Sequence, residues 1–103
     1  MAHSTFIILW KFRVKKESIP QFEKIYGPHG EWARLFQKSK SYIGTELYKD
    51  ATGSYLTVDE WVSREAYEKF KEDFVQEYRS LDAKCEDLTE EEIFIGSTVR
   101  SIP

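Results

Sequence analysis

The chain of 103 residues has few of the residues that mark a secreted, membrane-embedded or metal-binding protein. Cys85 is its single cysteine, which excludes an internal disulfide and agrees with a reducing, cytoplasmic location. No apolar run approaches the roughly 20 residues that a membrane-spanning helix needs. The sequence contains no His-x-x-x-His or Cys-x-x-Cys spacing, so we expect no dedicated metal site. We therefore expect a cytoplasmic protein that has no membrane partner.

The chain also lacks any concentration of positive charge. The formal net charge is −3, and Lys and Arg are interspersed with Asp and Glu without a basic stripe, so a nucleic-acid partner is not expected. The glycines match no phosphate-binding loop. Aromatic residues, by contrast, reach 16%, and large rings either strengthen a small core or line an interface or pocket. The length predicts one domain, residues 1–103, with one modest core.

Four segments have the alternation and the residue types of β-strands: residues 5–14, 42–48, 55–61 and 92–99. The middle two form a hairpin. We expect residues 50–53 to be its loop, which places Lys49 opposite Ser54. Leu47 then lies opposite Leu56 on an aliphatic face that should meet the helices.

Two segments have helical spacing. The first begins at Ser18, where Gln21 completes a capping box, and Gly27-Pro28 should break it before it resumes near Trp32. The second is expected to begin at the capping residue Ser63 and to run continuously before it frays between Leu81 and Asp87. Its apolar positions recur at helical spacing: Ala66, Tyr67, Phe70, Phe74, Tyr78 and Leu81.

The resulting order, β-α-β-β-α-β, predicts an α+β, ferredoxin-like fold in which helices cover one face of an antiparallel four-stranded sheet. The other face should carry apolar and aromatic side chains: Ile7, Leu9, Tyr42, Tyr48, Tyr55 and Trp61. Such a patch exceeds what monomers usually expose. We therefore expect a homodimer in which an identical subunit covers this face.

Three pieces of the sequence together resemble the antibiotic biosynthesis monooxygenase family: residues 44–50, residues 55–61, which end in Asp59-Glu60-Trp61, and residues 65–67. The resemblance extends over nearly the whole chain. It implies a dimeric α/β barrel, in which two ferredoxin-like sheets pair face to face. Some members of this family oxidise polycyclic aromatic substrates with O₂ and without metal, haem or flavin, whereas others degrade haem.

The resemblance also implies that haem is not the cofactor. The haem-degrading relatives carry an axial histidine where this chain has Lys71, and they use an asparagine that the first strand here lacks. We accordingly expect no cofactor.

The candidate site residues follow from the resemblance and from the predicted register. Asp59 and Trp61 match the family and could line a pocket, or could equally be an interface carboxylate and a packed ring. Four further residues are predicted on the same face and could form a substrate pocket: Glu46, Tyr48, Tyr55 and Thr57. Arg13 and Lys11 could neutralise the carboxylates of Glu46 or Asp59, or they could lie at a solvated strand end.

His29 is the candidate general base because the pKa range of histidine suits proton transfer near neutral pH. It could equally be a loop or capping histidine. Two functions remain open: a cofactor-independent monooxygenase acting on a small aromatic or quinol compound, and a non-catalytic dimeric module of the same fold that binds a small ligand or has a stress-related role. A titratable group inside the cavity would favour the enzyme.

Overall fold

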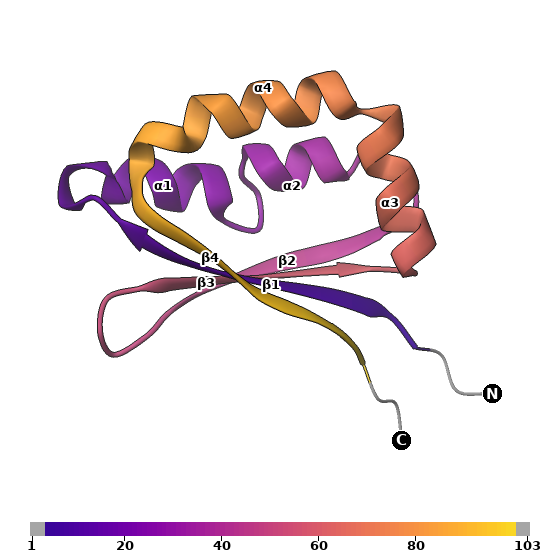
Figure 1. Cartoon of the computed structure of the whole chain (residues 1–103), viewed down its shortest axis with the longest axis horizontal. Helices are drawn as coiled ribbons and strands as arrows, with labels where there is room; N and C mark the ends of the chain where they lie inside the picture. Colours follow the sequence, from indigo (N-terminus) through magenta and orange to yellow (C-terminus); the bar gives the residue numbers. More distant parts are fainter. Residues whose placement is uncertain (1–3, 101–103) are drawn as a thin grey trace.

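The computed structural model describes residues 4–100 of the chain (Figure 1). Its elements in chain order are β1 (Phe6–Val14), the 3-10 helix η1 (Lys16–Ser18), α1 (Ile19–Tyr26), α2 (Glu31–Phe36), β2 (Tyr42–Lys49), β3 (Tyr55–Trp61), α3 (Arg64–Asp73), α4 (Val75–Cys85), the 3-10 helix η2 (Glu86–Leu88) and β4 (Thr89–Val99).

The four strands form one antiparallel sheet in the order β2-β3-β1-β4. All the helices lie on the same side of this sheet, with α4 running above α1 and α2 (Figure 1). The predicted α+β, ferredoxin-like architecture is therefore confirmed. Among the described residues, no helix has both the length and the apolar character to span a membrane.

The first helical segment is broken, as predicted. α1 ends at Gly27, whose N–H donates to the carbonyl of Glu23 at 3.1 Å, and α2 begins after Gly30. Gly30 packs directly against the end of α1: a Cβ atom there would lie 2.2 Å from the carbonyl oxygen of Ile25. The absence of a side chain at Gly30 thus lets the chain turn tightly enough for α2 to continue over the sheet.

The second helical segment is also broken, which the sequence analysis did not predict. Ser63 caps α3 by accepting a hydrogen bond from the N–H of Ala66 at 3.1 Å, as expected. The prediction of one continuous helix is wrong, because Phe74 (φ −120°, ψ 33°) separates α3 from α4. α3 holds Phe70 against Trp61, with ring centroids 5.0 Å apart, whereas α4 runs across α2 (Figure 1). One straight helix cannot make both contacts.

The hairpin register differs by one residue from the predicted one. Lys49 pairs with Tyr55 instead of Ser54. The Asp50 N–H donates to the Ser54 carbonyl at 2.8 Å, which leaves a three-residue loop, and Gly53 adopts the positive φ of 89° that this tight loop requires. The Asp50 carboxylate fixes the loop by accepting from the N–H groups of Thr52 and Ser54.

The shifted register places the inward side chains of β3 on the opposite face from the one predicted. Tyr55, Thr57 and Trp61 are buried under the helices, together with the inward-facing Asp59. From Thr45 onward β2 keeps its predicted faces: Thr45 is buried, whereas Glu46 and Tyr48 point away from the helices and are exposed. A register irregularity between Tyr42 and Gly44 reverses the start of the strand, so Tyr42, which was predicted on the uncovered face, packs against Phe36 of α2, and Ile43 is exposed. The prediction that these candidate residues share one face of the sheet is therefore wrong.

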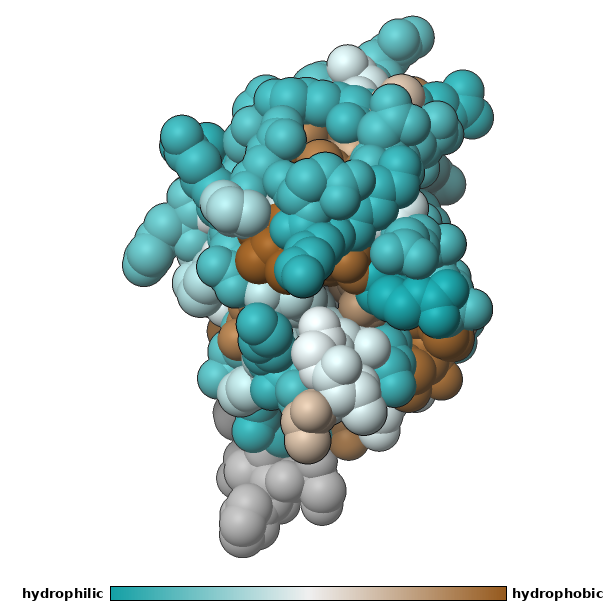
Figure 2. Space-filling model, turned by 90° about the vertical axis from the view of Figure 1, so that its left-hand side faces the viewer, coloured by the Kyte–Doolittle hydropathy of each residue, from teal (hydrophilic) through white to brown (hydrophobic). Residues whose placement is uncertain are grey.

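The sheet face that the helices leave uncovered, called here the open sheet face, is aliphatic at its centre. Leu9 of β1 pairs with Val58 of β3, and Ile7 and Leu56 extend the apolar surface. All four side chains are half-buried within one copy of the chain. At the end of the molecule seen in Figure 2, by contrast, hydrophilic side chains cover most of the surface and hydrophobic areas are small and separate.

We predict that Gly30→Ala strongly destabilises the fold, by more than about 2 kcal/mol, because the added methyl group must displace backbone atoms. Urea unfolding followed by circular dichroism measures the change. Gly44→Ala is the matched control, since a Cβ at Gly44 would meet no atom within 4 Å, and its unfolding midpoint should stay near that of the parent. Equal midpoints for both variants would contradict the close packing described for Gly30.

Candidate active site

A cavity of about 160 Å³ lies between the sheet and the helices and is called here the inner cavity. Most of its lining is aromatic or aliphatic, and a minority of the lining side chains are polar. The lining residues are Ile8, Trp10, Phe12, Tyr26, Trp32, Phe36, Thr45, Thr57, Asp59, Tyr67, Tyr78, Asp82 and Glu92. They come from every strand and from α1, α2, α3 and α4.

Asp59 is the carboxylate inside this cavity. Its Oδ1 atom accepts a hydrogen bond of 2.6 Å from the Thr45 hydroxyl, and the Thr45 oxygen accepts in turn from the Tyr42 hydroxyl at 2.5 Å. Within residues 4–100, the Oδ2 atom has no hydrogen-bond partner. Desolvation by burial raises the pKa of Asp59 to about 6, and the Thr45 hydrogen bond only partly opposes this rise. Asp59 can therefore exchange a proton near neutral pH.

Three phenols surround the same space. Burial is the main cause that raises the pKa of Tyr26, of Tyr67 and of Tyr78 above the ordinary tyrosine value. The negative charge of Asp59 adds to the rise for Tyr67 and Tyr78. All three side chains therefore stay protonated at neutral pH. Tyr67 and Tyr78 share a hydrogen bond with each other, so one of these two hydroxyl groups can donate to a ligand.

Two more carboxylates line the cavity away from Asp59. Asp82 projects from α4 and Glu92 from β4, and both side chains reach solvent. The pKa of Glu92 is raised, first by desolvation and then by the charges of Asp82 and Glu86. The lining contains no lysine, arginine or histidine among residues 4–100. The inner cavity is thus acidic as well as aromatic.

The structure separates the residues that the sequence analysis grouped. Asp59 and Thr57 line the inner cavity. Trp61 does not line it but lies fully buried beside it, in contact with Phe36 and Tyr67. Tyr55 is buried next to α1, and its hydroxyl donates to the Glu23 carboxylate.

The remaining candidates lie outside the inner cavity. Tyr48 donates to Glu46 at 2.7 Å on the open sheet face. Arg13 is exposed and forms ion pairs with Glu90 and Glu91 at 3.9 and 4.0 Å, instead of neutralising Glu46 or Asp59. His29 lies in the exposed turn between α1 and α2.

Sequence reasoning missed most of the cavity wall. It assigned Tyr26, Tyr67 and Tyr78 to apolar helix stripes, and Trp32 to the resumed helix. A signal was present, because three phenols on the buried faces of helices each need a hydrogen-bond partner. The indole Nε1 of Trp32 is buried without a partner among the described residues. The Nε1 atom of Trp61, which does not line the cavity, is likewise buried without a partner within residues 4–100, so the phenols are the signal that distinguishes the cavity wall from a packed core.

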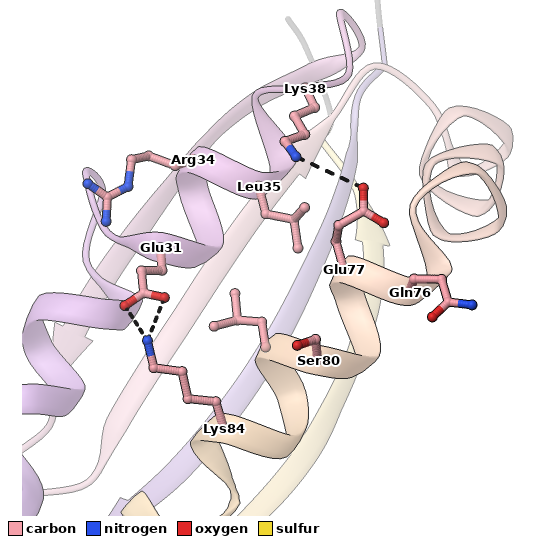
Figure 3. A pocket seen from close by; sticks show the side chains of 9 residues that line it. Glu31, Arg34, Leu35, Lys38, Gln76, Glu77, Ser80 and Lys84 are labelled. Carbon is pink, nitrogen blue, oxygen red and sulfur yellow. Dashed lines mark hydrogen bonds and ion pairs between the residues drawn. The ribbon is translucent and has the colours of Figure 1, made fainter.

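A larger hollow of about 680 Å³ lies on the outer side of the helices, between α2 and α4 (Figure 3). Two ion pairs cross it: Lys84 contacts both Glu31 oxygens at 2.9 Å, and Lys38 lies 4.0 Å from Glu77. Because these charged groups already satisfy one another, this hollow offers few free groups to a ligand. Within residues 4–100, no group of three or more His, Cys, Asp or Glu side chains is placed to hold a metal ion.

No family model and no curated protein matches this sequence. Solved structures do match its fold. SnoaB from Streptomyces nogalater, a cofactor-independent oxygenase solved in a mutant form, is 16% identical, with a TM-score of 0.60 over 98% of this chain and 94% of its own. A Nitrosomonas europaea protein provisionally named an antibiotic biosynthesis monooxygenase is 9% identical, with a TM-score of 0.66 over 97% and 91% of the two chains.

A NIPSNAP family protein from Agrobacterium tumefaciens is also similar, with 10% identity and a TM-score of 0.67 over 100% of this chain and 90% of its own. Identities this low establish the fold alone. The resemblance to the antibiotic biosynthesis monooxygenases is therefore confirmed at the level of the fold, which this chain shares along nearly its whole length.

We predict that Asp59→Asn stabilises the protein at pH 7 by about 3 kcal/mol, because the buried carboxylate no longer has to ionise. A raised pKa in the folded state contributes stability that is complete below the unfolded value of 3.8 and is lost as pH rises through about 6. The advantage of the variant should therefore be absent below pH 4 and should grow up to pH 6. Urea unfolding across this range measures it.

Asp82→Asn is the control for this experiment, since Asp82 is exposed and its replacement should change the free energy of unfolding by less than about 0.5 kcal/mol at every pH. An Asp59→Asn effect of the same size at pH 4 and pH 7 would contradict the pKa shift of Asp59.

Proposed function

We propose that this protein is a cofactor-independent monooxygenase and that Asp59 removes a proton from an aromatic substrate bound in the inner cavity. The observation that carries the proposal is the partnerless Oδ2 atom of a carboxylate with a pKa of about 6, placed between aromatic walls. A base is most effective when its pKa lies near the working pH. The fold shared with a cofactor-independent oxygenase agrees with this chemistry, although a shared fold alone does not establish an activity.

The size of the inner cavity favours a substrate with a single ring. A cavity of about 150 Å³ holds one benzene molecule, and the inner cavity is about 160 Å³. A polycyclic compound would require the walls to move. We therefore narrow the substrate class to dihydroxybenzenes and related single-ring phenols.

The reaction balances without a further reductant. Asp59 accepts the hydroxyl proton, and the resulting phenolate gives one electron to O₂. Recombination of the ring radical with superoxide forms a carbon–oxygen bond. The O–O bond then breaks, one oxygen atom stays on the ring, and the other leaves as water together with two hydrogens of the substrate. A dihydroxybenzene and O₂ thus give a hydroxyquinone and water.

The inner cavity supports these steps by desolvating Asp59 and by offering phenol donors. Tyr67 and Tyr78 lie close enough to Asp59 for its charge to raise the pKa of both. Their hydroxyl groups can stabilise the phenolate in a setting of low dielectric constant, where such hydrogen bonds are strongest.

We also propose that a second copy of the chain covers the open sheet face. The support is the aliphatic centre formed by Leu9, Leu56 and Val58, with Ile7 beside it. β4 adds Ile93, which pairs with Lys11 on the same face of β1 as Leu9 and leaves 41% of its surface in solvent. Apolar surface of this extent is typical of a subunit interface.

We predict O₂ consumption with a dihydroxybenzene in the presence of a chelator and without flavin or nicotinamide. Asp59→Asn should lower kcat by about 10² or more, the usual contribution of a positioned base. Because the base must be ionised, kcat/KM should rise with pH up to about 6 and then level off. An oxygen electrode, corrected for autoxidation of the substrate, measures all three effects.

His29→Ala is the second arm of this experiment, because His29 remains the alternative base predicted from the sequence. If Asp59 is the base, turnover by His29→Ala should equal that of the parent. Loss of turnover in His29→Ala with full turnover in Asp59→Asn would transfer the role to His29. Binding of a phenol without any O₂ consumption would favour the non-catalytic binding module.

We predict a homodimer of about twice the chain mass of 12.2 kDa. Val58→Asp should yield a monomer, since a charge at the centre of the open sheet face cannot be buried without a partner. Light scattering coupled to size exclusion measures the mass. Ser80→Asp, which adds the same charge on the exposed side of α4, should remain dimeric. A parent protein that is monomeric at high micromolar concentration would rule out this interface.

A further inference from the structure

We propose that the ligand of the inner cavity is a single-ring phenol that carries a protonated amine. The inference rests on the proposed function in one respect, namely that the phenol hydroxyl binds at Asp59. It adds that the substrate is positively charged and that its ammonium group binds to the carboxylates of Asp82 and Glu92.

The first support is the charge of the cavity lining. Asp59, Asp82 and Glu92 are its ionisable carboxyl groups, and no cationic side chain among the described residues joins them. Lys71 lies 5.1 Å from the ring centre of Tyr67 and 5.9 Å from that of Tyr78, but it is not part of the lining. An anionic ligand would therefore meet uncompensated negative charge.

The second support is the aromatic character of the walls. Tyr26, Trp32, Tyr67 and Tyr78 bring together aromatic rings around the cavity, and proteins bind ammonium groups with rings of this kind. The ring of Trp32 lies edge-on to that of Tyr78, with centroids 5.1 Å apart. Carboxylates and aromatic faces thus favour the same kind of ligand group.

The third support is the spacing of the acidic groups. Asp59 pairs with Ile8 of β1, whereas Glu92 pairs with Phe12 of the same strand. These positions are four residues apart, which is roughly 13 Å along a strand at about 3.3 Å per residue. Asp82 lies near Glu92, since its charge raises the pKa of Glu92. The cavity therefore has one acidic group at one end and two at the other.

This arrangement also answers a difficulty of the proposed reaction. Removal of the phenol proton creates a negative charge in a space that already holds carboxylates and no cation among its described lining residues. A substrate that carries its own ammonium group offsets this charge, because the ammonium remains at Asp82 and Glu92 while the phenolate forms near Tyr67 and Tyr78. The buried indole Nε1 of Trp32, which lacks a partner, could donate to an oxygen atom of such a ligand.

The test uses ligands that differ only in charge. Tyramine, 4-ethylphenol and 3-(4-hydroxyphenyl)propanoate share a phenol ring with a short side chain that is cationic, neutral and anionic, respectively. Isothermal titration calorimetry with the full chain at pH 7 should show tyramine binding at least about tenfold more tightly than 4-ethylphenol. The anionic compound should bind most weakly. Equal affinities for tyramine and 4-ethylphenol would overturn the proposal.

The double variant Asp82→Asn, Glu92→Gln locates the ammonium. It should reduce the affinity for tyramine to that for 4-ethylphenol and leave the affinity for 4-ethylphenol unchanged. Both side chains reach solvent, so the variant should keep the unfolding midpoint of the parent. A tyramine preference that survives in this variant would also overturn the proposal.

The two proposals fail in different ways. A tyramine preference without O₂ consumption by the matching dihydroxyphenyl amine would leave the ligand class standing and remove the oxygenase. Consumption of O₂ with an uncharged dihydroxybenzene, together with equal affinities for the amine and the neutral phenol, would support the oxygenase and rule out the cationic ligand. The binding experiment requires no turnover, so neither result depends on the other.

Discussion

The three-residue loop between β2 and β3 is the constraint on which the candidate site depends. Asp50 closes this loop with its backbone and its carboxylate, and Gly53 supplies the positive φ that the loop requires. The side chains of a strand alternate between faces, so one more residue in the loop would turn β3 over relative to β2. Asp59 would then face away from the helices, and Thr45 could not reach it. A short surface turn thus determines the chemistry of the interior.

The same interior explains why a carboxylate can be held there. Trp61 is fully buried among Phe36, Tyr42, Tyr67 and Phe70, with ring centroids 5.0 to 5.4 Å away. Rings of this size bury much apolar area and stabilise a small fold, which offsets the cost of desolvating one acid. Thr45 and Tyr42 then orient the acid. Groups that cost stability and are nevertheless well oriented are more often found at functional sites than in purely structural interiors.

The fold could be predicted from the sequence because it follows from local periodicity. The strand alternation, the break at Gly27-Pro28 and the cap at Ser63 are properties of neighbouring residues. The site could not be predicted in the same way. The apolar match of Leu47 with Leu56 favoured the wrong register, because it weighed side-chain pairing above the geometry of the Asp50 turn. The bend at Phe74 depends on where α3 and α4 pack, and tertiary contacts of that kind leave no local pattern.

The helix pair α2 and α4 lies between two hollows of opposite chemical character. On the outer side, Glu31 pairs with Lys84 and Lys38 with Glu77, and exposed pairs of this kind contribute little to stability and leave little free to bind a ligand. On the inner side, the smaller cavity is lined by the carboxylate of Asp59, which Thr45 holds through Oδ1, and by Trp32, whose buried Nε1 atom has no partner among the described residues. Buried polar atoms are normally paired. The inner cavity is therefore the better candidate for a binding site, because its lining includes an ionisable carboxylate, whereas the charged groups of the larger hollow are mostly paired with one another.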